Sequence, residues 1–136
     1  MQYLVKIKES DGKFMVTYPD FSGLTAHGSS LEDAMKNAAK TLNSYLEKDY
    51  DGDDLPKPGT KGGRDFYEIS VSNHIEIAYT LKKLRKNRTQ QEIAQGLGVT
   101  RQAYQKFENP RKCNPAIKTL ERLSMALGKR LEIRFK

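Results

Sequence analysis

The chain has 136 residues, of which 37% are hydrophobic and 30% charged, a length that fits one medium domain or two small ones. A single cysteine, Cys113, excludes an intramolecular disulfide framework and a cysteine-built zinc site. The two histidines, His27 and His74, are too few and too far apart to indicate a metal centre. No apolar run approaches the roughly 18 residues of a membrane helix, and the N-terminus lacks a signal-peptide block. We expect a reduced cytoplasmic protein with no metal and no cofactor.

The net charge of +7 is unevenly distributed along the chain. Residues 1–74 contain 9 Lys/Arg and 12 Asp/Glu, whereas residues 75–136 contain 15 and 5, so the halves carry −3 and +10. Such an asymmetry suggests an anionic partner for the second half, most often nucleic acid, although a solvated basic surface would have the same composition. We therefore expect two domains with separate functions, 1–72 and 73–136.

The first half begins with a predicted β-hairpin. Apolar and polar residues alternate over 3–8 and again over 14–18, as in half-buried strands. Asp11-Gly12 lies between them and tolerates the positive φ of a tight turn. A third short strand is expected over 24–27. These three strands should form one sheet.

A helix is expected after the third strand. Ser29 or Ser30 can cap it, with an acid three residues later completing a capping box. Its apolar side chains fall on one face, which should pack on the sheet: Leu31, Ala34, Met35, Ala38, Leu42 and Leu46. Residues 49–65 are acidic or rich in proline and glycine and should be irregular. Alternation over 67–71 predicts a last strand, which gives a small β-β-β-α-β domain of the α+β class.

The most specific signal in the second half is the segment 89–109, TQQEIAQGLGVTRQAYQKFEN. Thr89 is expected to cap one short helix, Gly98 to end it in the left-handed conformation, and Thr100 to cap the next. Two short helices joined by a three- or four-residue glycine turn are typical of a helix-turn-helix. Glu108 lies among basic residues and is expected to pair with one of them.

Over about residues 75–128 the chain resembles the λ-repressor/Cro, or XRE, class of helix-turn-helix domains. The resemblance implies that Arg101, Gln102 and Gln105 reach bases in the major groove. It also implies that Gln90, Lys106 and Asn109 hold phosphates and brace the recognition helix. An ordinary solvated polar position is the alternative for each. The expected DNA-binding set is Gln90, Thr100, Arg101, Gln102, Gln105, Lys106 and Asn109.

The end of the chain is unlike a typical repressor terminus. Asn114-Pro115 is expected to cap a further helix that Gly128 ends. In the tail, Leu131, Ile133 and Phe135 alternate with charged residues and predict a strand over 130–136. An isolated apolar edge needs a partner, and the same tail of a second chain is the natural one. We expect Leu131, Ile133 and Phe135 to form a dimerisation strand that joins two DNA-reading domains.

Residues 1–72 are similar to the HicB antitoxin family of type II toxin–antitoxin systems. The similarity rests on the hairpin, on YPDFSGLTAHG at 18–28 and on SLEDAMKNA at 30–38. Attachment to a C-terminal helix-turn-helix is a known architecture of that family. The resemblance implies a partial RNase H-like fold, binding of a HicA-type mRNA-cleaving toxin, and repression of the shared operon. Together with the tail strand, this predicts a homodimer or higher even oligomer.

The candidate toxin contacts are Asp20, Phe21 and Leu24, although core or turn packing explains Phe21 and Leu24 more readily. An RNase H site needs converging carboxylates, one of them on the first strand, and residues 3–8 contain none. We therefore expect no catalytic residues and no enzymatic activity. Two alternatives stay open: a transcriptional regulator whose first domain senses a ligand or dimerises, and, less favoured, a nuclease.

Overall fold

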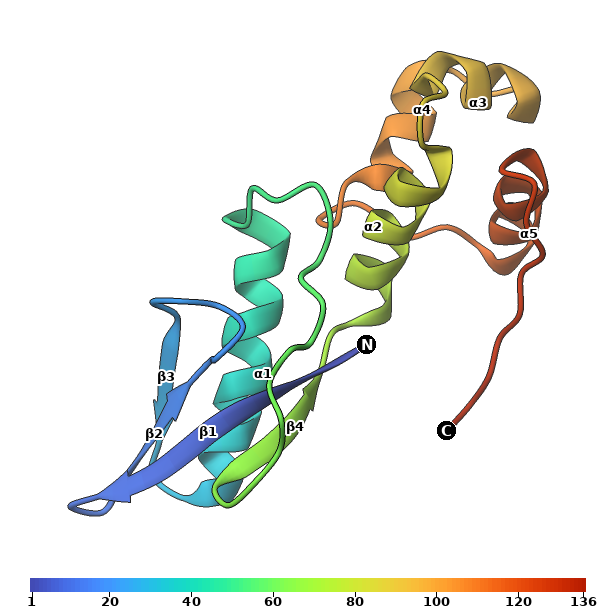
Figure 1. Ribbon diagram of the computed structural model, residues 1–136. Coiled ribbons are helices and arrows are strands. Elements are labelled where there is room, and N and C mark those ends of the chain that lie inside the picture. The colour runs from blue at the N-terminus through green and yellow to red at the C-terminus, as the bar shows by residue number, and fades with distance from the viewer. The chain divides into compact units, whose positions relative to one another are not determined.

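A computed structural model describes all residues, Met1–Lys136, and divides them into two compact units, Met1–Glu76 and Ile77–Lys136. The mixed α+β class expected from the sequence is confirmed. The first unit contains a sheet and one long helix, and the second is helical (Figure 1). The helix α2 (Asn73–Arg85) begins in the first unit and continues into the second. None of the helices is long and apolar enough to cross a lipid bilayer.

The sheet of the first unit has four antiparallel strands in the order β3-β2-β1-β4. Their bounds are β1 Gln2–Ser10, β2 Lys13–Thr17, β3 Thr25–Gly28 and β4 Phe66–Ser70. The hairpin turn is the expected Asp11-Gly12 pair, with φ of 52° and 77°. Positive φ at both turn residues matches the twist of the flanking strands. The last strand of the unit pairs with the first, so that Tyr3 lies opposite Ile69.

The core of the first unit lies between the sheet and α1 (Leu31–Lys48), which runs along one sheet face (Figure 1). The side chains of β1 that face the helix are Tyr3, Val5 and Ile7, all at most 3% exposed. On α1, the buried residues repeat every four positions: Ala34, Ala38, Leu42 and Leu46. The apolar stripe expected from the sequence therefore contains the buried face of the helix.

The start of α1 is fixed by a capping box. Ser30 Oγ accepts a hydrogen bond from the Asp33 amide at 3.0 Å, and the Asp33 carboxylate accepts one from the Ser29 amide at 2.9 Å. These bonds satisfy backbone donors that the first turn of a helix leaves free. Of the two serines that the sequence offered, Ser30 is the cap.

The segment 49–65 is irregular, as expected, but it is attached to the sheet at several points. The Pro56 carbonyl accepts a hydrogen bond from the Tyr3 hydroxyl at 2.6 Å, and the Ile7 amide donates to the Asp65 carbonyl at 2.9 Å. Leu55 is buried. Side-chain packing and backbone hydrogen bonds thus hold a segment that has no regular secondary structure.

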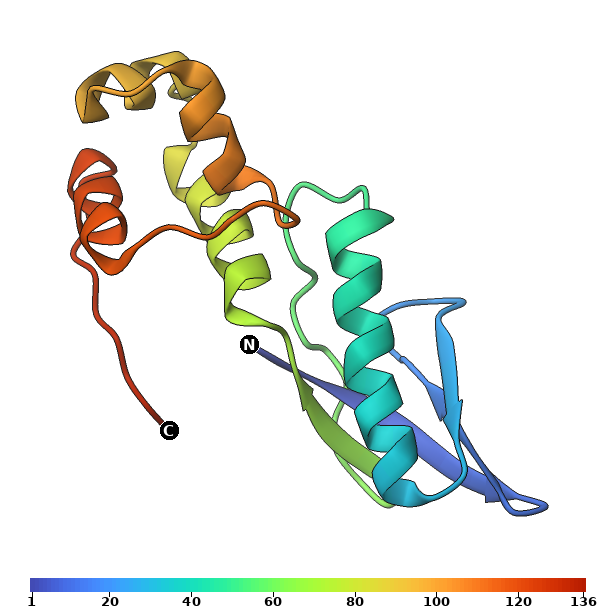
Figure 2. The same ribbon diagram turned by 180° about the vertical axis from the view of Figure 1, so that it is seen from behind.

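The helical unit consists of the end of α2, α3 (Gln90–Leu97), α4 (Arg101–Gln105), the 3-10 turn η1 (Lys106–Glu108) and α5 (Ile117–Ala126). The irregular residues 109–116 connect η1 to α5 (Figure 2). One apolar cluster joins the helices: Leu81, Ile93, Ala94, Leu97, Tyr104, Leu123 and Leu127.

Two sequence predictions for the end of the chain are wrong for the single chain. Helix α5 begins at Ile117, with Ala116 as a cap that makes no side-chain bond, so Asn114-Pro115 does not cap it. Residues 130–136 form no strand. A strand needs a neighbouring strand for its hydrogen bonds, and every strand of the chain already belongs to the sheet of the first unit.

Candidate nucleic-acid interface

The turn between α3 and α4 has the geometry that the sequence predicts. Thr89 Oγ1 accepts from the Glu92 amide at 3.1 Å and starts α3. Gly98, with φ 71°, ends it, and the Val99 amide donates to the Ala94 carbonyl at 3.0 Å. Thr100 Oγ1 accepts from the Ala103 amide at 3.1 Å and starts α4. A three-residue turn, 98–100, therefore joins two capped helices.

The orientation of α4 is set by its buried face. Ala94 of α3 and Tyr104 of α4 are both fully buried in the apolar cluster. The Tyr104 and Phe107 rings meet edge to face, with centroids 6.3 Å apart. Since this face is fixed inward, the opposite face of α4 and η1 must point to solvent.

That solvent face carries most of the predicted DNA-binding side chains. Arg101, Gln102, Gln105 and Lys106 are all exposed. Arginine can donate to guanine and to phosphate oxygens, glutamine can read adenine, and lysine supplies a positive charge for phosphate. The structure thus brings these four onto one short segment. Thr100 is also exposed, with its hydroxyl engaged as the helix cap.

The other two predicted residues are already engaged within the domain. Gln90 Nε2 donates to Glu108 Oε1 at 3.3 Å, and Asn109 Oδ1 accepts from the Arg111 amide at 2.9 Å. Both are half-buried. The first bond joins α3 to the last residue of η1, and the second closes a turn in the loop that follows η1.

Glu108 pairs with arginine, as the sequence predicts. Its carboxylate accepts from Arg85 Nε at 2.7 Å and from Arg85 Nη2 at 3.0 Å. Burial by itself would raise the pKa of Glu108, but the hydrogen bonds, first among them those from Arg85, bring it below its ordinary value. The ionised pair joins the last turn of α2 to the end of the segment formed by α4 and η1, residues 101–108, which we call the recognition segment.

Sequence reasoning missed two further arginines that hold the helices together. Arg88 donates to the Ala126 and Leu127 carbonyls at 3.1 and 3.3 Å, at the end of α5. Arg122 donates to the Leu97 carbonyl at the end of α3. Both satisfy acceptors that a helix end leaves free. Their partners lie 25 or more residues away, so no local pattern distinguishes them from surface arginines.

In the first unit, the three candidate toxin contacts have different environments. Phe21 is buried and packs edge to face on Tyr3, with ring centroids 4.9 Å apart, so it belongs to the core. Asp20 is half-buried, and its Oδ1 accepts from the Gly59 amide at 3.2 Å. Leu24 is half-buried. Core packing therefore accounts for Phe21, and Asp20 anchors the segment 49–65.

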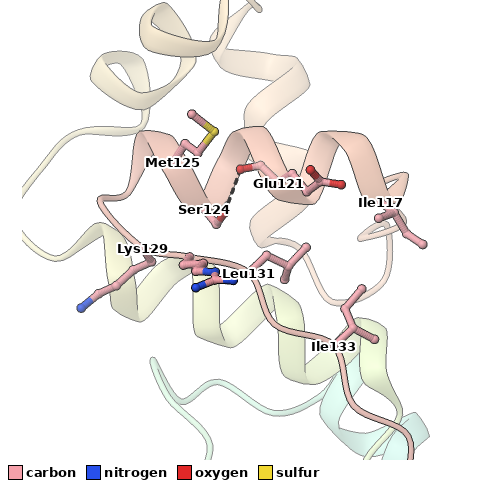
Figure 3. Close-up of a pocket in the computed structure, with 8 residues that line it drawn as sticks. Ile117, Glu121, Ser124, Met125, Lys129, Leu131 and Ile133 are labelled. Atoms are coloured by element: carbon pink, nitrogen blue, oxygen red, sulfur yellow. Dashed lines mark hydrogen bonds between the residues drawn. The ribbon is translucent and has the colours of Figure 1, made fainter.

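The predicted dimerisation residues lie in the irregular tail. Leu131 is half-buried, Ile133 is 52% exposed and Phe135 is 98% exposed. The tail and α5 enclose an open groove of about 440 Å³, into which Leu131 and Ile133 project from the tail side (Figure 3). It is lined by Ile117, Glu121, Ser124, Met125, Lys129, Arg130, Leu131 and Ile133.

Comparison with known proteins agrees with this geometry. Residues 81–133 match the helix-turn-helix family, so the second unit is a helix-turn-helix domain of the DNA-binding class. Over 137 aligned residues the chain is 28% identical to Antitoxin HicB 2 of Photorhabdus laumondii subsp. laumondii, an alignment that covers 98% of this chain and 95% of that protein. Both resemblances expected from the sequence are confirmed.

Proposed function

We propose that the chain is an antitoxin that neutralises a HicA-type mRNA-cleaving ribonuclease and represses its own operon. In this proposal the first unit binds the toxin and the helix-turn-helix domain binds operator DNA. The observation that carries the proposal is the exposed face of Arg101, Gln102, Gln105 and Lys106 on a helix-turn-helix. It lies in a chain that aligns almost end to end with a protein described as an antitoxin.

Charge supports the DNA-binding half. Residues 77–136 contain 15 Lys/Arg and 4 Asp/Glu, a net charge of +11. Neutralising phosphates releases counterions, so log K should fall steeply with log salt, by about 0.9 for each phosphate contacted. A homodimer would place two recognition segments on half-sites about 34 Å apart. A salt-independent affinity would contradict this part of the proposal.

Charge also supports the toxin-binding half. Residues 1–76 contain 9 Lys/Arg and 13 Asp/Glu, a net charge of −4, which complements a small basic ribonuclease. The strand β3 pairs only with β2 and so leaves one sheet edge for a partner. The proposal assigns no reaction to the unit itself, because β1 has no carboxylate within residues 3–8 on which a two-metal nuclease site could be built.

The decisive experiment is affinity purification of the tagged full-length chain from its native host in high salt, followed by intact mass measurement. High salt removes nucleic acid and weak ionic partners, whereas a protein interface with an apolar core survives it. We expect a stoichiometric small basic protein whose RNA cleavage stops when the chain is added. Recovery of the chain alone, while the neighbouring gene is expressed, would overturn the antitoxin function.

A matched variant separates the two proposed roles. The double substitution Arg101→Ala and Gln102→Ala removes two exposed side chains without touching the buried face of α4. It should abolish operator binding and leave inhibition of the toxin unchanged. DNA release by a small molecule, with no toxin recovered, would favour the alternative of a ligand-sensing regulator.

A further inference from the structure

Exposed apolar side chains gather at the C-terminal end of the helical unit. The chain has six large apolar residues that are strongly exposed, and four of them, Ile117, Met125, Ile133 and Phe135, lie on α5 and the tail. Leu131 and Ile133 project into the groove beside α5 (Figure 3). A concentration of this kind marks an interaction surface, because soluble monomers rarely leave such a patch uncovered.

We propose that this surface is covered by the same tail of a second copy, paired antiparallel in a register centred on Ile133. The inference rests on the proposed dimeric, operator-binding function and adds the register and the contacts. In this register Ile133 faces itself across the two-fold axis. Leu131 faces the partner's Phe135, and Glu132 faces the partner's Arg134.

The overlap of apolar side chains selects this register, and opposite charges beside the axis support it. Residues opposite each other in an antiparallel pair point to the same side of the ribbon. With Ile133 at the centre, the apolar residues 131, 133 and 135 share one side. On the other side, Glu132 meets Arg134 twice, once on each side of the axis. Opposite charges at directly facing positions stabilise a pair of strands.

The neighbouring registers pair fewer apolar side chains and place like charges on the axis itself. A centre at Glu132 would put the two Glu132 side chains opposite each other and Arg130 opposite Arg134. A centre at Arg134 would pair Glu132 with Lys136, but it would put two arginines on the axis and leave Leu131 without an apolar partner. A centre between two residues would place each apolar side chain opposite a charged one, which mixes the two sides of the ribbon. The centre at Ile133 places Arg130 opposite Lys136 at the ends of the ribbon, but it is the one centre that pairs all three apolar residues and puts opposite charges beside the axis.

The same register gives the most exposed side chain a partner. Phe135 is 98% exposed in the single chain. Pairing places it about 5 Å from Leu131 of the other copy, measured between Cβ atoms. Leu131 lines the groove together with Met125 of α5. Each Phe135 therefore covers the groove of the partner chain. Glu132 and Arg134, whose Oε1 and Nη2 atoms lie 2.8 Å apart within one chain, stay on the solvent side of the ribbon.

Disulfide crosslinking of full-length chain tests the register. Opposite residues of an antiparallel pair have Cα atoms about 4.5–5.5 Å apart, within the range of a disulfide. The variant Ile133→Cys should therefore oxidise to a covalent dimer, seen as a doubled mass in non-reducing gels. Glu132→Cys or Arg134→Cys alone should not, because each residue lies two positions from its own copy, roughly 8 Å away and beyond reach. A mixture of those two variants should give the mixed dimer.

The wild-type chain is the control for this experiment. Its one cysteine, Cys113, is buried, and burial raises the pKa of its thiol to about 11, so mild oxidation should leave it unpaired. Crosslinking by Glu132→Cys or Arg134→Cys alone, or by none of the variants, would overturn the register.

Sedimentation of the wild-type chain distinguishes a failure of the paired tails from a failure of the proposed dimeric, operator-binding function. A dimer without crosslinks at 132–134 would reject the paired tails and leave dimeric operator binding intact. A monomer that binds operator DNA normally would reject the dimer and leave DNA binding. A chain that neither dimerises nor binds DNA would reject the operator-binding function itself.

Discussion

Arg85 holds Glu108 through two charged hydrogen bonds, 2.7 Å from Nε to Oε2 and 3.0 Å from Nη2 to Oε1. The carboxylate is almost completely buried, with 2% of its side chain exposed, whereas 18% of the Arg85 side chain is exposed. The two residues join the end of α2 to the end of the recognition segment. The position of the exposed face that we propose binds DNA therefore depends on an ion pair that is not part of that face.

Removing the carboxylate should loosen the helical unit. Glu108→Ala leaves the Arg85 guanidinium without its partner, and breaking a buried pair costs several kcal/mol. Because Arg85 keeps some contact with solvent, we expect a loss of about 2–3 kcal/mol. Amide hydrogen exchange at Ile93 and Leu97, in the buried face of α3, measures the stability of this unit. The exposed residue Glu121 provides the control, since Glu121→Ala should change exchange little.

The same pair predicts a specific response to pH. The pKa of Glu108 is lower in the folded chain than its ordinary value, so its contribution to stability is complete above about pH 5, where the unfolded carboxylate is also ionised. The contribution is lost as the pH falls through the folded pKa. The stability difference between the wild-type chain and Glu108→Gln should therefore shrink between about pH 5 and pH 3. A constant difference over this range would contradict the assignment.

Two glycines of the helix-turn-helix should respond in opposite directions to alanine. Gly98 has φ 71°, so Gly98→Ala should destabilise the domain by about 1 kcal/mol although no atom blocks the added Cβ. Gly96 lies within α3, also in open space, and Gly96→Ala should stabilise by about 0.5–1 kcal/mol through helix propensity. Thermal or urea unfolding of the two variants provides a comparison in which the added methyl group is the same.

Base reading and phosphate binding should be separable on the exposed face. If Arg101 reads a guanine, Arg101→Ala should weaken operator binding by about 1–3 kcal/mol and relax specificity at one base pair. Lys106→Ala should weaken all sequences alike and reduce the salt slope by about 1. Base reading and phosphate binding are distinguished by measuring the affinity of each variant for the operator and for operators with single-base changes. An equal loss on every sequence for Arg101→Ala would leave it only a phosphate contact.

Exchanging charges in the tail should first break and then restore the dimer. Glu132→Arg places an arginine opposite the partner's Arg134, and two such repulsive pairs should weaken association by about 1–2 kcal/mol. The double substitution Glu132→Arg with Arg134→Glu restores opposite charges in the register centred on Ile133. Dissociation constants from sedimentation should therefore return close to the wild-type value. A double variant as weak as the single one would argue against facing charges.

Local patterns were sufficient for the elements and for the recognition motif. Strand alternation, the Asp11-Gly12 turn, the Ser30 cap and the Thr89, Gly98 and Thr100 signals each depend on residues within a few positions of one another. Such features are encoded by backbone conformation and by side chains that bond to nearby amides. The exposed face of α4 follows from the same short-range spacing, because burying Tyr104 turns Arg101 and Gln105 outward.

Long-range contacts were beyond the reach of these patterns. The pairing of β4 with β1 and the partners of Arg88 and Arg122 depend on residues 25 or more positions away. The tail is a case in which a local pattern predicts an element that the single chain does not form. Its alternating sequence favours a strand, yet the single chain forms none, because backbone hydrogen bonds need a neighbouring strand. The sequence by itself therefore determined the helices, the strands of the first unit and the recognition motif of this protein. Only the tertiary structure decided which distant residues pair with each other and whether the tail forms a strand, since those properties arise when distant segments meet.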